Sequence, residues 1–103
     1  MIEMVSAMSL FLTPSIVVSA NCVKGNGRYY QGTVNRTKGG LECQPWYTPH
    51  PHTHTSPPAV FPEMSNSSNY CRNGGGGEHT PWCFTMDPLI RWQHCEIEEC
   101  GGY

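Results

Sequence analysis

The sequence predicts a small disulfide-rich domain, built mostly of loops with a few short antiparallel β-strands. Three observations support this prediction. The chain has only 103 residues, it contains six cysteines, and its 11 glycines and nine prolines favour turns over long helices. A hydrophobic core of this size needs covalent staples, and an even number of cysteines in a short chain suggests three disulfides.

Zinc binding is the competing use of the cysteines, because the chain also has five histidines. Zinc modules commonly reuse a Cys-x-x-Cys pair, and no such pair is present. Disulfides are therefore favoured, with a small metal-binding Cys/His domain as the alternative. A thiol titration distinguishes the two, because only the metal-binding domain would release six thiols after chelation.

Signals for the secretory pathway agree with disulfides. The tripeptides that begin at Asn35 and Asn66 are acceptors for N-glycosylation. Leu10–Ala20 is an apolar run that ends in the small-residue form of a signal-peptidase site, and it is too short to span a bilayer. We expect residues 1–20 to be a signal peptide and the mature chain to begin at Asn21. The alternative is a fragment edge, because the first residues include Glu3 and no basic residue.

Along the rest of the chain, extended segments are short and prolines are frequent. Six of the nine prolines lie between residues 43 and 62, which excludes a helix there. A turn is predicted at Asp87-Pro88. Four segments are expected to be extended, and the second and third of these to pair: Tyr29–Val34, Asn69–Cys71, Pro81–Thr85 and Arg91–Cys95.

Composition argues against several function classes. Only 14% of the residues are charged and the formal net charge is −2, whereas nucleic-acid-binding proteins usually carry a basic stripe. No nucleophile stands in a Gly-x-Ser-x-Gly elbow, so we expect no enzymatic activity and no cofactor.

The segments around the cysteines carry a specific pattern. Its most specific part is the sequence NYCRN at residues 69–73, followed by PWCFT at residues 81–85. The other parts are GNGRYYQGT at residues 25–33, CQPW at 43–46, Asp87-Pro88, Arg91-Trp92 and Cys95. From Cys22 to Cys100 this pattern closely resembles the kringle family. The resemblance implies a kringle domain at residues 22–100, followed by a short tail at residues 101–103.

Two parts of the chain resemble different kringles. The middle, with QPW at residues 44–46, PHTHT at 51–55 and FPE at 61–63, is most similar to the kringle of the Ror receptor tyrosine kinases. The C-terminal part, with Asp87-Pro88 and Arg91-Trp92, is similar to the kringles of plasminogen and related proteases.

Cysteine arithmetic alone leaves 15 possible pairings of six cysteines. The kringle resemblance implies one of them: Cys22 with Cys100, Cys43 with Cys83, and Cys71 with Cys95. Each bridge would close a loop of tens of residues and stabilise the fold by roughly 3–4 kcal/mol, less any strain.

The resemblance also points to a ligand site. Lysine-binding kringles carry an Asp-x-Asp pair for the lysine ammonium, an aromatic trough for its methylenes and cations for a carboxylate. Here four glycines at residues 74–77 replace the acidic stretch, and at most Glu78 stands in for one acid. Trp82, Phe84 and Trp92 match the trough and Arg91 matches one cation, while Ser56 falls where some lysine binders carry a second.

We therefore expect weak or no lysine binding, which aspartates at Gly75 and Gly77 would strengthen. The alternative is that the tryptophans only pack around the disulfides.

Two further clusters have simple interpretations. His50, His52 and His54 alternate along a segment that would place them on one face, but prolines are interleaved, so we predict no metal there. Glu96, Glu98 and Glu99 are interpreted as a solvated acidic edge, or alternatively as a patch for a basic partner. The sequence as a whole predicts an extracellular module that binds a protein partner or docks against a neighbouring domain.

Overall fold

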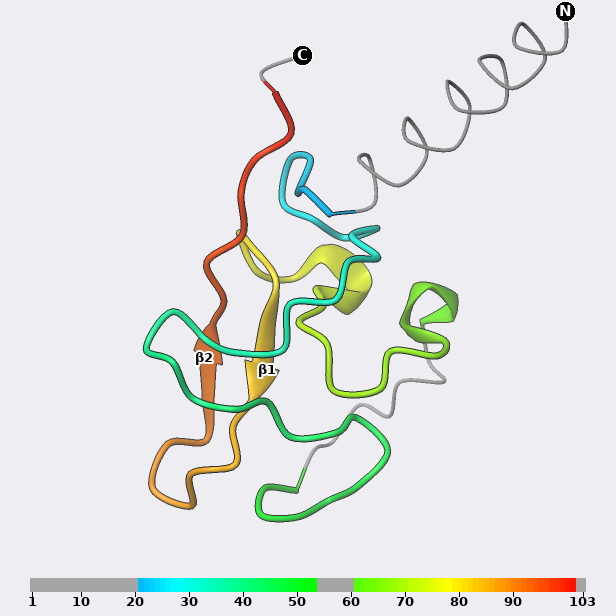
Figure 1. Cartoon of the computed structure of the whole chain (residues 1–103). Coiled ribbons are helices and arrows are strands. Elements are labelled where there is room, and N and C mark those ends of the chain that lie inside the picture. Colours follow the sequence, from blue (N-terminus) through cyan, green and yellow to red (C-terminus); the bar gives the residue numbers. More distant parts are fainter. Residues whose placement is uncertain (1–20, 54–60, 102–103) are drawn as a thin grey trace, which may run out of the picture.

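The structure, a computed structural model, describes residues 21–53 and 61–101 (Figure 1). Two short 3-10 helices, η2 (Pro62–Met64) and η3 (Gly74–Gly76), precede the strands β1 (Trp82–Phe84) and β2 (Trp92–His94). The strands form a two-stranded antiparallel sheet, in which Trp82 lies opposite His94 and Phe84 lies opposite Trp92. Loops make up most of the described chain, so the predicted fold class is confirmed.

A tight turn at Asp87 connects the two strands. The backbone N–H of Ile90 donates to the Asp87 carbonyl over 3.1 Å, and the Leu89 N–H donates to the Asp87 carboxylate over 2.9 Å. Fully buried Thr85 supports this turn, because its hydroxyl oxygen accepts the Asp87 N–H. The turn predicted at Asp87-Pro88 is confirmed.

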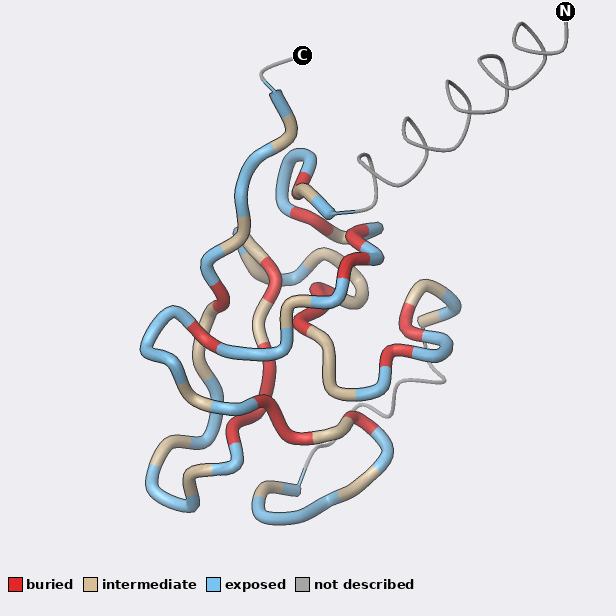
Figure 2. The backbone as a smooth tube through the Cα atoms, viewed as in Figure 1, coloured by how far each residue is buried: buried red, intermediate tan, exposed pale blue. Residues whose placement is uncertain are grey.

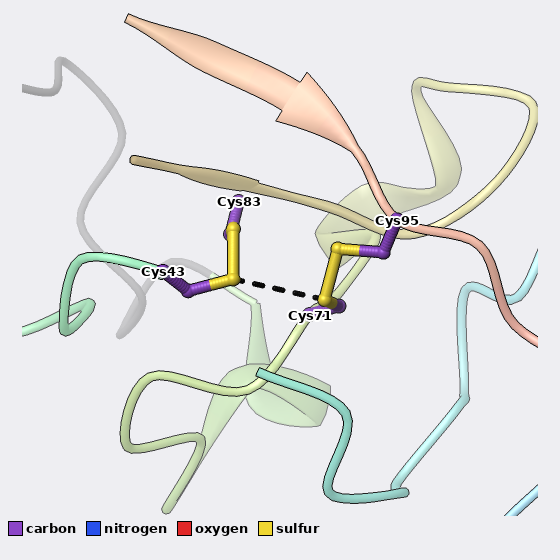
Figure 3. A group of neighbouring side chains, drawn as sticks. All are labelled: Cys43, Cys71, Cys83 and Cys95. Carbon is purple, nitrogen blue, oxygen red and sulfur yellow. Dashed lines mark hydrogen bonds between the residues drawn. A yellow bond between two sulfur atoms is a disulfide. The ribbon is translucent and has the colours of Figure 1, made fainter. Parts of the chain in front are cut away.

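Two disulfides occupy the centre of the molecule. Cys43 pairs with Cys83 and Cys71 pairs with Cys95, and all four residues are buried (Figure 3). The Sγ atoms of Cys43 and Cys71 lie 3.7 Å apart. Because both sulfurs are in disulfides and carry no proton, this is a packing contact that joins the two bridges into one unit.

Few apolar side chains surround this pair of bridges. Trp46, Met64 and Phe84 complete the buried cluster, and Figure 2 shows buried positions along β1 and on the segments beside it. A core this small agrees with the expectation that covalent staples hold the fold.

The third disulfide joins the two ends of the domain, where Cys22 pairs with Cys100. Beside it, the Val23 N–H donates to the Glu98 carbonyl and the Cys100 N–H donates to the Val23 carbonyl, each over 2.9 Å. The three pairs are those that the kringle resemblance implies. No helix among the described residues is long and apolar enough to cross a bilayer.

Two strand predictions are wrong. Tyr29–Val34 is not a strand, because the Tyr30 side chain folds back over Gly32 and its hydroxyl accepts the Val34 N–H. The partner of β1 is β2 rather than Asn69–Cys71. Next to that segment, Arg72 forms only a single bridge with Trp82, through two backbone hydrogen bonds of 3.0 and 2.9 Å.

Candidate functional site: an aromatic groove between two charges

The register of the sheet places four ring side chains on one face. Residues directly opposite each other share a face, so Trp82, Phe84, Trp92 and His94 lie together while Cys83 faces the disulfide core. Trp82 contacts Phe84 edge-to-face at a centroid distance of 5.1 Å and contacts Trp92 at 5.6 Å. A short hairpin thereby builds a continuous aromatic surface.

Trp46 supports this surface from below. Its ring lies edge-on to Trp82 at 5.2 Å and to Phe84 at 5.9 Å, and its indole N–H donates to the Tyr70 carbonyl over 2.7 Å. Exposure rises outward from this base: Phe84 is 8% exposed, whereas Trp92 is 41% exposed. The inner rings thus belong to the core, and Trp92 presents its ring to solvent.

The aromatic surface forms the floor of a groove of about 280 Å³, lined by Glu78, Trp82, Phe84, Arg91 and Trp92. The Arg91 guanidinium carbon lies 5.1 Å from the Phe84 ring centroid, within cation–π range. The groove therefore combines an apolar floor with one anionic and one cationic side chain. The five tentative ligand-binding residues of the sequence prediction are brought together here.

The Glu78 carboxylate is paired with a histidine of β2. Its Oε1 lies 2.9 Å from His94 Nε2, so one oxygen is already in contact with a ring nitrogen. The Glu78 backbone is fixed by Asn73, whose amide group accepts the Glu78 N–H and donates to the Glu78 carbonyl. Asn73 is 1% exposed and also donates to the Asn26 carbonyl. Because Asn73 directly precedes the glycine run and Glu78 directly follows it, the two bonds between them clamp both ends of the run.

The glycines have a packing role that sequence reasoning missed. A Cβ on Gly74 would lie 2.7 Å from Met64 Cγ, and a Cβ on Gly75 would lie 2.8 Å from Phe61 Cζ. Gly75 and Gly76 also have φ angles of +76° and +68°, which L-residues rarely adopt. Within residues 74–77, Gly77 alone has open space around its Cβ position.

Gly75 is therefore an unsuitable position for the aspartate that the sequence suggested, and Gly77 is a suitable one. Glycines are required at 75 and 76 by the backbone and at 74 and 75 by the ring and thioether that pack against them.

Glu63 binds the backbone of the glycine run through its carboxylate. Its carboxylate accepts the Gly75 N–H over 2.8 Å and the Arg28 Nε–H over 3.0 Å. The hydrogen bond from Gly75 is the main reason that the pKa of Glu63 lies below its usual value. The hydrogen bond to Glu63 likewise raises the pKa of Arg28.

Arg72, part of the most specific sequence motif, has a structural role. It is 3% exposed, and its guanidinium donates to the Gly32 and Cys71 carbonyls over 2.8 Å. The guanidinium also lies over the rings of Tyr30 and Tyr70. Burial lowers the pKa of Arg72, and these contacts satisfy a cation that never reaches the groove.

The remaining predicted positions that the structure describes are not among the residues that line the groove. His50 is exposed, and His52 Nε2 lies 2.8 Å from the Asp87 carbonyl. Asn35, Asn66 and the three glutamates of the acidic edge are exposed. His54, Ser56 and the expected signal peptide at residues 1–20 lie outside the described residues, as do the last two tail residues.

Sequence reasoning missed two residues beside the groove, His94 and Asn73. The signal for His94 was present, because alternation in Trp92–His94 places residues 92 and 94 on one face. Asn73 belongs to the NYCRN motif, but no local pattern indicates its clamping role, because its partners include a residue 47 positions earlier.

All six cysteines are in disulfides, so the alternative of a metal-binding Cys/His domain is not favoured. Three bridges, a two-stranded sheet and a charged aromatic groove define a small disulfide-stapled module. A family model described as the kringle domain matches residues 22–100, and the chain therefore belongs to the kringle family. Kringle domains are non-catalytic modules that bind proteins, and they are typical of extracellular proteins.

Proposed function

We propose that this chain is an extracellular, non-enzymatic module whose aromatic groove binds a lysine-like side chain of a protein partner or neighbouring domain, weakly. The observation that carries this proposal is the arrangement of Glu78 and Arg91 around a floor of three rings. A lysine-like ligand has an ammonium group, an apolar stem and, at a chain end, a carboxylate. The groove offers a complement to each of these parts.

The exposure of Trp92 supports a role beyond packing. A tryptophan that only stabilised the disulfide core would be expected to bury its ring, as Trp46 does, yet Trp92 is 41% exposed. An ammonium over such a ring contributes about 0.5–2 kcal/mol.

Weak affinity follows from the anionic side of the groove. Among the lining residues Glu78 is the one carboxylate, and its Oε1 is already hydrogen-bonded to His94. A charge-assisted hydrogen bond contributes about 1.5–3 kcal/mol. Compared with an Asp-x-Asp pair, the groove has one carboxylate fewer, and the carboxylate that remains is shared with His94, so much of the affinity for an ammonium group is lost. We expect a Kd for 6-aminohexanoate on the order of 1 mM or weaker.

Calorimetric titration with 6-aminohexanoate tests this proposal, with hexanoate as the matched ligand that lacks the ammonium. Trp92→Ala and Arg91→Gln should weaken binding, whereas Arg36→Gln, on a loop outside the groove lining, should not. Equal binding of both ligands, or unchanged affinity in Trp92→Ala, would show that the groove does not recognise lysine-like groups.

The extracellular location rests on the disulfides, the apolar N-terminus and the two acceptor asparagines. Asn35 and Asn66 are both exposed, which leaves room for a glycan at each. Expression in a eukaryotic secretory pathway should yield a chain that starts at Asn21 and carries glycan at one or both asparagines. Retention of Met1 without any glycan would contradict the location. The closer similarity to Ror or plasminogen kringles stays a prediction.

A further inference from the structure

We propose that Glu78, His79 and His94 form a site for a divalent transition-metal ion such as Zn²⁺ at the edge of the groove. One ring nitrogen of each histidine and one Glu78 carboxylate oxygen lie within 4.8 Å of one another. The site uses none of the six disulfide-bonded cysteines. It shares only Glu78 with the proposed lysine-like site and does not depend on that function.

The spacing of the three side chains is close to that of a metal-bound set. His94 Nε2 and Glu78 Oε1 are 2.9 Å apart, and the rings of His79 and His94 lie 4.4 Å apart at an interplanar angle of 52°. Tetrahedral zinc with bonds of about 2.0–2.1 Å places neighbouring ligand atoms about 3.4 Å apart. Small side-chain rotations are therefore sufficient to place all three groups on one ion.

The backbone beneath two of the ligands is already fixed. Asn73 holds both the N–H and the carbonyl of Glu78. His94 lies in β2, and its carbonyl accepts the Lys38 N–H over 2.9 Å. At these two ligands a metal ion would consequently order only the side chains, which lowers the conformational entropy lost on binding.

The chemistry of the three groups selects the kind of ion. Two imidazoles and one carboxylate suit Zn²⁺, Cu²⁺ or Ni²⁺, whereas Ca²⁺ and Mg²⁺ prefer sets made of oxygen ligands. Three protein ligands leave a fourth position for water or for a group on a partner.

A simple hydrogen bond between His94 and Glu78 is the competing explanation of the cluster. That bond accounts for two of the side chains but does not require the exposed His79 ring next to His94. The role of His79 therefore decides between a metal site and an isolated pair.

Zn²⁺ titration of the untagged, disulfide-intact chain, followed by NMR of the histidine ring signals, tests the site. The signals of His79 and His94 should shift together with one binding curve. His50 supplies the internal control, because it and His54 have the His-x-x-x-His spacing of many zinc sites. A curve in which His50 responds and His79 and His94 do not would overturn the proposal.

Affinity measurements make the test quantitative. His79→Ala should weaken Zn²⁺ binding by roughly tenfold or more, and Glu78→Gln should also weaken it, whereas His50→Ala should leave it unchanged. His79 is exposed, so its removal should not affect folding. Cu²⁺ provides a second readout: it should quench Trp92, whose ring lies 5.1 Å from His94, in the parent and less in His79→Ala. Unchanged Zn²⁺ affinity in His79→Ala would refute the site.

Discussion

The two sides of the groove are built in different ways. The aromatic floor comes from a hairpin whose alternation and cross-strand register place the rings of Trp82, Phe84 and Trp92 together. The anionic side comes from the glycine run, residues 74–77, and the adjacent Glu78. That run has little sequence character of its own, and its shape is imposed by Phe61, Met64 and Glu63 from another part of the chain.

Compared with lysine-binding kringles, this groove keeps the aromatic residues and lacks the acidic pair, and the difference in construction shows that these two features need not have one cause. Trp82 and Phe84 are held by the disulfide core, so these two rings would persist whether or not a ligand bound. The glycines are held by close packing, so their lack of side chains has a structural reason that is independent of lysine recognition. Each side can therefore be altered by itself.

Removing the bridge that joins the two regions should have the largest effect. Cys71 lies within the NYCRN motif that leads into the glycine run, and Cys95 directly follows β2. The double variant Cys71→Ala with Cys95→Ala should lose about 3–4 kcal/mol of stability in the chain-entropy model. Urea unfolding of the purified variant measures this loss, and a loss below about 1 kcal/mol would contradict the central role of the bridge.

Within the glycine run, we expect some positions to require glycine and others to accept a side chain. Gly75→Ala should destabilise the fold by about 2–3 kcal/mol, because it combines a positive φ with overlap against Phe61. Gly77→Ala is the matched control; its φ of −75° suits any residue, so we expect a neutral effect or a gain of up to about 1 kcal/mol. Thermal unfolding of both variants decides, and equal stability would refute the packing explanation.

A carboxylate at the permissive position should strengthen the anionic side without disturbing the floor. Gly77→Asp adds a negative charge next to Glu78 in open space, and we expect affinity for 6-aminohexanoate to rise by roughly 2- to 10-fold. Gly77→Asn supplies the neutral control of the same shape. If Asn and Asp raise the affinity equally, then charge is not the limiting feature of this groove.

The smallest effect concerns Glu63, which anchors the glycine run by accepting the Gly75 N–H. The folded-state pKa of Glu63 lies below its usual value, so its carboxylate contributes stability above the usual pKa of 4.5 and loses that contribution as pH falls through the lowered value. The stability difference between the parent and Glu63→Gln should therefore shrink on acidification. Urea midpoints from pH 7 down to pH 3 measure it, with Glu96→Gln on the exposed acidic edge as the control. A stability difference that stays constant across this pH range would contradict the stabilising role of the Glu63 carboxylate.

The sequence by itself determined the class of the fold and the location of the sheet's aromatics. Cysteine number in a short chain predicts disulfide staples because a small core cannot stabilise the chain alone. Aromatic residues in short extended segments predict strands, and Asp87-Pro88 predicts the turn between them. The pairing of the cysteines came from the kringle resemblance, since counting cysteines leaves 15 possibilities.

Only the tertiary structure decided what the glycines and the polar residues do. The contact between Gly75 and Phe61, the clamp by Asn73 and the bond between Glu78 and His94 join residues that are distant in sequence. Such contacts leave no local periodicity, so pattern analysis cannot predict them. Tyr29–Val34 is wrongly predicted as a strand for a different reason: the Tyr30 ring folds onto Gly32 and its hydroxyl accepts the Val34 N–H, contacts between near neighbours that strand propensity does not capture.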